Sequence, residues 1–145
     1  MKVRFGTEAD IPLIMELSRE YNSLDGLREN FRLDEEYFEA FLNKSLKNGY
    51  YVIIPESDDG FLLFTENNYA CNPEPYLMDI AFYVRESGRG GTTENMIEAY
   101  EIYAKERGIK YVMLSMSSHI NHKRLERYYR IKGYKPDSIS LIKEV

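Results

Sequence analysis

Apolar residues recur every three or four positions in four stretches of the chain, and this spacing predicts amphipathic helices. Thr7, with Asp10 three residues later, is typical of a capping box and predicts the entry to the first helix. Asp34 opens the second helix, and Asn48 with Gly49 ends it. The apolar stripes of these two helices are Leu13, Ile14, Leu17 and Tyr21, and then Tyr37, Phe38, Phe41, Leu42 and Leu46.

The third and fourth predicted helices cover residues 92–107 and 121–132. Glycines that tolerate a left-handed backbone follow both of them, Gly108 after the third and Gly133 after the fourth. The apolar face of the third helix consists of Met96, Ile97, Tyr100 and Ala104.

Runs of β-branched and aromatic residues predict strands between these helices. Their expected bounds are residues 2–5, 50–54, 61–65, 76–84, 110–116 and 138–142. The turn signal Asp58-Asp59-Gly60 joins the second and third strands as a hairpin. The order β-α-α-β-β-β-α-β-α-β predicts an α/β fold of the α+β kind, with a mixed, mostly antiparallel central sheet flanked by helices. We expect residues 1–145 to form a single domain, because no repeat or linker interrupts them.

Composition narrows the class of protein. Hydrophobic residues make up 43% of the 145 and charged residues 30%, as in an ordinary soluble domain. The only cysteine, Cys71, excludes an internal disulfide and fits a reducing compartment, so we predict a cytoplasmic protein. The sequence has no signal-peptide pattern and no apolar run near the roughly 18 residues of a membrane span. A net charge of −5 disfavours nucleic acid as a partner and is compatible with a cationic amine substrate.

A glycine-rich loop over residues 85–93 carries the main functional signal. Gly88, Gly90 and Gly91 allow a ligand to approach the backbone closely, and the first amides of the following helix suit a phosphate. Arg89 adds a cation. Close packing of two elements is the alternative explanation of the glycines. A dinucleotide site is disfavoured, because its Gly-x-Gly-x-x-Gly run belongs near the start of a parallel sheet with an acidic residue about 20 positions later.

The loop resembles the cofactor loop of the GCN5-related N-acetyltransferases in two registers. Arg85-Glu86-Ser87-Gly88-Arg89-Gly90 matches the family pattern of Arg or Gln, two residues, Gly, one residue, and Gly or Ala. Counting back from the helix pair Met96-Ile97 gives a register three residues later. That register consists of Arg89, Gly90, Gly91, Thr92 and Thr93, and it resembles the Arg-Gly-Gly-Thr-Thr variant of bacteriophage acetyltransferases. We favour it, because helix phase fixes which amides face the pyrophosphate.

Other segments support the same resemblance. Residues 3–11 are similar to the opening strand and helix entry of the family, and residues 106–112 to its helix-to-strand junction. Residues 121–134 are similar to its Asn…Phe-Tyr-x-x-x-Gly-Phe signature, although the spacing from Asn121 to Tyr128 is one residue longer than usual. The resemblance implies an acetyltransferase that uses acetyl-CoA as co-substrate, needs no metal, and transfers the acetyl group directly to a primary amine in a ternary complex.

The resemblance also implies roles for individual residues. Tyr129 matches the tyrosine that contacts the cofactor sulfur and acts as general acid; packing against the sheet is the alternative. Asp79, alone among apolar residues, matches the strand position of a general base that acts through water. Its alternatives are binding of a cationic amine and acceptance of a hydrogen bond at a strand end. Backbone amides of Phe82, Tyr83 and Val84 would bind the cofactor carbonyl.

Weaker candidates lie outside this set. His119 and His122 have a metal-like spacing, with Cys71 as the only further soft ligand, and a pair without metal is favoured. The cations Lys123, Arg124, Arg127, Arg130 and Lys132 predict a solvated helix face. The expected acceptor is a small-molecule or peptide amine, and a homodimer stays open. The competing class is a catalytically inactive module of the same fold that binds CoA or a protein partner.

Overall fold

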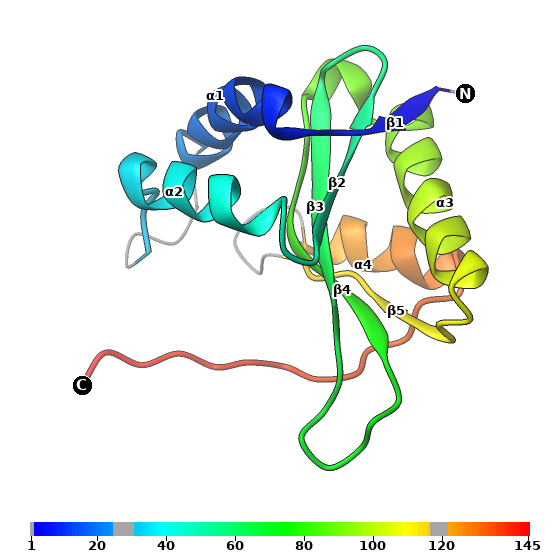
Figure 1. The fold of residues 1–145 in the computed structure, drawn as a ribbon. Coiled ribbons are helices and arrows are strands. Elements are labelled where there is room, and N and C mark those ends of the chain that lie inside the picture. The colour runs from blue at the N-terminus through cyan, green and yellow to red at the C-terminus, as the bar shows by residue number, and fades with distance from the viewer. Residues whose placement is uncertain (1, 25–30, 117–121) are drawn as a thin grey trace.

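A five-stranded sheet organises the described residues, 2–24, 31–116 and 122–145, of this computed structural model (Figure 1). The strands stand in chain order, β1 (Val3–Phe5), β2 (Tyr50–Pro55), β3 (Gly60–Asn67), β4 (Tyr76–Val84) and β5 (Tyr111–Met113). Neighbours from β1 to β4 are antiparallel, whereas β5 is parallel to β4. The predicted mixed, mostly antiparallel sheet is therefore confirmed.

Helices cover both faces of the sheet (Figure 1). The helices α1 (Ile11–Asn22) and α2 (Glu35–Ser45) lie on one face, and α3 (Gly91–Glu106) and α4 (His122–Ile131) lie on the other. Two short 3₁₀ helices, η1 (Glu8–Asp10) and η2 (Glu86–Gly88), precede α1 and α3. No helix in the described ranges is both long enough and apolar enough to cross a membrane.

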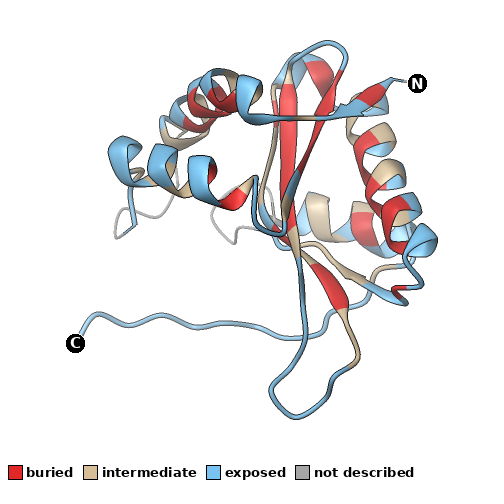
Figure 2. Ribbon diagram, in the orientation of Figure 1, coloured by how far each residue is buried: buried red, intermediate tan, exposed pale blue. Residues whose placement is uncertain are grey.

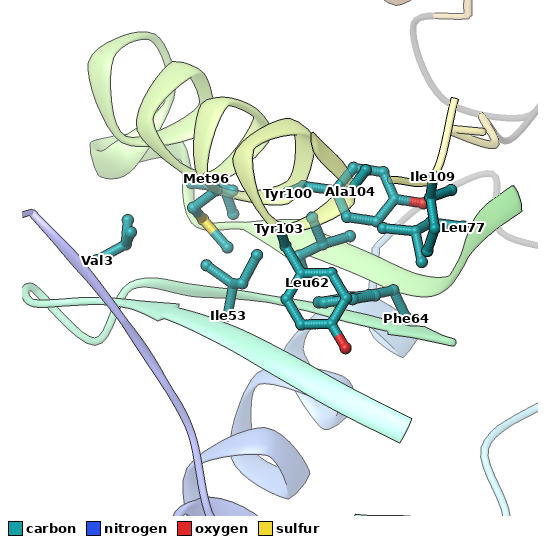
Figure 3. Close-up of a cluster of buried hydrophobic side chains, with 11 residues drawn as sticks. Val3, Ile53, Leu62, Phe64, Leu77, Met96, Tyr100, Tyr103, Ala104 and Ile109 are labelled. Atoms are coloured by element: carbon teal, nitrogen blue, oxygen red, sulfur yellow. The ribbon is translucent and has the colours of Figure 1, made fainter. Parts of the chain in front are cut away.

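The sheet separates two apolar clusters, and Figure 2 shows the buried residues gathered along its strands and on the inner sides of the helices. One cluster joins α1 and α2 to residues such as Val52 and Leu63. The other joins α3 to residues such as Leu62 and Leu77 (Figure 3). All four predicted residues of the α3 stripe are buried, which follows from their helical spacing.

Local end signals act as the sequence predicts. The Thr7 side chain accepts a hydrogen bond from the Ala9 amide, and the Asp10 carboxylate accepts one from the Thr7 amide at 2.7 Å, completing the capping box. The Asp34 side chain accepts from the Tyr37 amide and caps α2. Gly108 follows α3 with φ of +69°.

Three predictions for single segments are wrong. Residues 138–142 form no strand, and Ile139 and Leu141 are 85% and 94% exposed, because a strand needs a partner and none lies beside this segment among the described residues. The strand predicted over residues 110–116 shortens to β5. Tyr37 is 75% exposed and does not belong to the α2 stripe, since its position faces away from the sheet.

Candidate functional site

The glycine-rich loop, residues 85–93, joins β4 to α3 and includes the first three residues of that helix. Its first half, residues 85–88, packs against the protein itself. A Cβ added at Gly88 would lie 2.3 Å from the Asp59 carboxylate, so a larger residue here would force the Asp59 side chain to move. The Arg85 side chain turns toward α1 and donates to Glu20 at 2.8 Å and to Glu16 at 3.0 Å. This pairing raises the pKa of Arg85 and lowers that of Glu20. Neither Arg85 nor Gly88 is therefore available to a ligand in this arrangement.

The second half of the loop is open. Gly90 has φ of +96°, a backbone conformation that glycine adopts without strain, and a Cβ added at Gly91 would meet nothing within 4 Å. The Glu94 amide makes the first helical hydrogen bond of α3, to the Gly90 carbonyl at 3.0 Å. The amides of Gly91, Thr92 and Thr93 precede that bond and belong to the donors that a helix start leaves for caps or anions. These residues fit a pyrophosphate.

Before the chain reaches this helix start, β4 and β5 separate. The strands pair from Tyr76 with Tyr111 to Met78 with Met113, and β4 then continues to Val84 beside β3 alone. Phe82, Tyr83 and Val84, the predicted carbonyl-binding residues, lie in this unaccompanied part of β4 and pair with β3. The geometry leaves one side of β4 without a strand neighbour in the described residues.

Asp79 lies at the point where the strands separate. It is 7% exposed, and its Oδ1 accepts a hydrogen bond from the Ser115 amide at 2.9 Å. Burial raises the pKa of this carboxyl to about 6, and the hydrogen bonds from Ser115 oppose that rise. A carboxyl with this pKa exchanges its proton near neutral pH, as a general base must. The geometry also fits the alternative of a strand-end hydrogen-bond acceptor.

Tyr129 comes from α4 to the same region. It is 7% exposed, and its pKa is raised first by burial and then by the Asp79 carboxylate, which lies close enough to act on it. The phenol therefore keeps its proton at neutral pH, although a higher pKa also makes it a weaker acid. Tyr100 and Tyr134 also have raised pKa values, mainly from burial, with Asp79 as a further cause. The two predicted catalytic residues are thus both buried, and the Asp79 carboxylate contributes to the raised pKa of Tyr129.

The end of α4 lies beside the start of α3. Lys132 donates to Glu94 at 2.7 Å and lies 5.7 Å from the centre of the Tyr128 ring. The Tyr128 hydroxyl is buried and has no hydrogen-bond partner among the described residues. The other cations of the predicted helix face are exposed as expected: Lys123, Arg124, Arg127 and Arg130.

Two surface pockets in the described ranges contain none of the predicted site residues. One, of about 340 Å³, lies between β1 and α3, and the other, of about 360 Å³, lies near the end of α1.

Only some of the weaker candidate residues lie in the described part of the chain. Cys71 is exposed in the loop between β3 and β4. Asn121 and His119 lie outside the described residues, and nothing is described of the His122 side chain. No group of three or more His, Cys, Asp or Glu side chains that could hold a metal occurs in the described part of the chain.

Sequence reasoning missed the partners of these residues. It placed Tyr100 only in an apolar stripe, yet the Tyr100 hydroxyl donates to the Met113 carbonyl at 2.9 Å. Ser115 and Asp59 were not singled out either. No local signal could have found these contacts, because Asp79 and Ser115 are 36 residues apart and Gly88 meets Asp59 only through the fold.

Comparison with known proteins supports the fold. No protein-family profile and no curated protein sequence matches the chain. Solved structures, in contrast, match almost the whole chain. An aminoglycoside acetyltransferase from an uncultured soil metagenomic sample, in complex with trehalose, is 19% identical with a TM-score of 0.72, over 99% of this chain and 95% of that one.

Two bacterial structures are similar to the same extent. A ribosomal-protein-alanine N-acetyltransferase from Brucella melitensis biovar Abortus 2308 is 18% identical with a TM-score of 0.72, over 99% of this chain and all of its own. A predicted acetyltransferase with acetyl-CoA from Clostridium acetobutylicum is 18% identical with a TM-score of 0.75, over 98% of this chain and 94% of that one. The chain therefore has the fold of the GCN5-related N-acetyltransferases.

Proposed function

We propose that the protein is an N-acetyltransferase that transfers an acetyl group from acetyl-CoA to a primary amine. The observation that supports the proposal is an open helix start at Gly91, which follows the strand from which β5 separates at the buried Asp79. Tyr129 lies close enough to Asp79 for that carboxylate to raise its pKa. Residues 1–145 would act as one N-acetyltransferase domain. The phage-type resemblance of residues 89–93 and a cytoplasmic location rest on the sequence alone and stay predictions.

The residues would divide the work as follows. The amides of Gly91, Thr92 and Thr93, with the Arg89 side chain, would bind the pyrophosphate of the co-substrate. Bound acetyl-CoA supplies a thioester whose acetyl carbon is the electrophile. Backbone amides among Phe82, Tyr83 and Val84 would stabilise the negative charge that develops on the carbonyl oxygen.

Two proton transfers complete the reaction. Asp79, through a water molecule, would take the proton of the amine as its nitrogen forms the new C–N bond. The C–S bond breaks, and Tyr129 would give its proton to the leaving sulfur. The products are an N-acetyl amine and CoA, and no acyl-enzyme forms. The acceptor class is a small-molecule or peptide amine, since the similar structures include enzymes named for aminoglycosides and for a ribosomal protein.

Thermal denaturation with and without acetyl-CoA tests binding, and CoA release across a panel of amines tests transfer. A ligand at about 100 times its Kd stabilises the native state by about 2.7 kcal/mol, which raises Tm measurably. Stabilisation with CoA release on one amine is the expected result. No stabilisation at millimolar acetyl-CoA would exclude both the enzyme and a CoA-binding module. Stabilisation without release on any amine would favour the inactive module.

The Tyr129→Phe variant tests the general acid. Loss of the phenol proton should lower kcat about 100-fold or more, while the affinity for acetyl-CoA changes little. The matched control is Tyr128→Phe, which removes the neighbouring buried hydroxyl and should leave kcat unchanged. Steady-state kinetics at several pH values give the answer, and an unaltered kcat in Tyr129→Phe would remove the assignment.

A further inference from the structure

The end of the β4–β5 ladder is held by two side chains. After Met78 pairs with Met113, the Ser115 amide donates to Asp79 Oδ1 at 2.9 Å. The Tyr100 hydroxyl of α3 donates to the Met113 carbonyl, also at 2.9 Å. The backbone of the chain that leaves β5 is therefore attached both to the neighbouring strand and to the helix above it.

Both side chains are fixed by their surroundings. Tyr100 is fully buried, and its ring packs against Phe64 with centroids 5.0 Å apart (Figure 3). Asp79 lies opposite Phe64, next to a β-bulge in which Ile80 has no partner on β3. A bulge bends its strand and re-aims the adjacent side chains. The two attachment points thus come from a rigid helix and a bent strand.

Loss of these hydrogen bonds would leave buried polar groups without partners, which costs more free energy than loss of an exposed bond. Asp79 is buried, so water does not readily replace it as acceptor for the Ser115 amide. An acceptor with a charge makes the stronger bond. The hydrogen bonds to Ser115 and Met113 therefore restrict the position at which the chain after β5 leaves β4.

We infer that Asp79 and Tyr100 are positioning residues that fix where β5 leaves β4, and so set the width of the gap between the strands. The inference rests on the proposed function, in which the acyl-CoA thioester lies in this gap. It gives Asp79 a role that depends on its oxygen as an acceptor, separate from a role in taking a proton.

The two roles respond differently to substitution. Asp79→Asn keeps an oxygen that can accept the Ser115 amide but cannot serve as a base, whereas Asp79→Ala loses both functions. Acetyl-CoA affinity, measured by calorimetry, should stay near that of the wild type in Asp79→Asn and fall about tenfold in Asp79→Ala, the worth of one hydrogen bond. Tyr100→Phe keeps the buried ring and should lower affinity by about threefold to tenfold. Separately, a base role lowers kcat in Asp79→Asn without a change in affinity.

A readout without co-substrate separates this inference from the proposed function. Amide hydrogen exchange of Ser115, followed by NMR in the unliganded protein, should accelerate in Asp79→Ala and not in Asp79→Asn. If the wild type does not bind acetyl-CoA, the proposed function fails while the exchange data still decide the attachment. Wild-type affinity and unchanged Ser115 exchange in both Asp79→Ala and Tyr100→Phe would overturn the inference.

Discussion

The two halves of the glycine-rich segment, residues 85–88 and 89–93, both begin with an arginine and contain glycine, and the fold uses them in opposite ways. In residues 85–88, the arginine is paired with Glu16 and Glu20 and the glycine is pressed against Asp59. In residues 89–93, the arginine is exposed and the space beside Gly91 is empty. A literal motif match falls on the half that the protein needs for its own packing. A glycine in a ligand loop is therefore best judged by what a Cβ would meet.

The largest effect on acetyl-CoA binding is expected from a bulky residue at Gly91, in the open half of the loop. Gly91→Phe should fold normally, because the added side chain enters open space. It should lower acetyl-CoA affinity about 100-fold or more, since overpacking against the ligand costs about 3 kcal/mol. Calorimetric titration measures the affinity and thermal denaturation the stability. An affinity equal to that of the wild type would place the ligand elsewhere.

The carboxylates of Glu20 and Asp79 make the stability of the protein depend on pH in opposite directions. Glu20 has a lowered pKa because Arg85 pairs with it, so its contribution to stability is lost as pH falls. Asp79 has a pKa raised to about 6, so the folded state binds more protons than the unfolded state between about pH 4 and 6. Its effect is therefore a loss of stability as pH rises through that window.

Asp79→Asn should remove this loss. Relative to the wild type, the free energy of unfolding of the variant should grow from about pH 4 to 6 and then stay level, by at most about 3 kcal/mol. Urea denaturation across pH 4–8 measures it. A difference that does not change with pH would mean that the carboxyl is not held at a raised pKa.

Gly88→Ala makes the reverse test of Gly91→Phe. The added Cβ would collide with the Asp59 carboxylate, and we expect a loss of about 2 kcal/mol in stability. The folded variant should bind acetyl-CoA nearly as well as the wild type. Chemical denaturation and titration at low temperature give both numbers. A large loss of acetyl-CoA affinity in Gly88→Ala, with unchanged stability, would indicate that the ligand binds to the first half of the loop.

The two arginines offer the smallest and most closely matched comparison. Arg89→Met should weaken acetyl-CoA binding about tenfold, and less at high salt, because it removes an exposed cation from the phosphate site. Arg85→Met should leave affinity unchanged and alter stability by less than about 1 kcal/mol, since its ion pairs are partly exposed. If the two substitutions lowered acetyl-CoA affinity equally, the two halves of the loop would not differ in ligand binding.

The fold was predictable where the signals are local. The capping box at Thr7, the Asp34 cap and the bounds of β4 all depend on neighbouring residues, and all were found. The failed strand at residues 138–142 has the right alternation of residues, but pairing depends on a distant edge that propensity does not report.

The candidate site was predictable in its residue types and not in its partners. Asp79 stood out as a lone carboxyl, and burial indeed raises its pKa. The choice between two loop registers depends on Asp59 and Glu20, which are 29 and 65 residues from the glycine and arginine that they contact. Their contacts exist only in the folded chain. Sequence patterns therefore offer both registers, and packing occupies the side chain of Arg85 in the first register while the space beside Gly91 in the second stays open.

The central claim is that the second half of the loop binds the co-substrate. Titration of the ¹⁵N-labelled protein with CoA, followed through backbone amide shifts, tests it most directly. The amides of Gly91, Thr92 and Thr93 should shift most and saturate together, while that of Gly88 moves little. Shifts centred on residues 85–88, or no shifts in the loop at saturating CoA, would contradict the account.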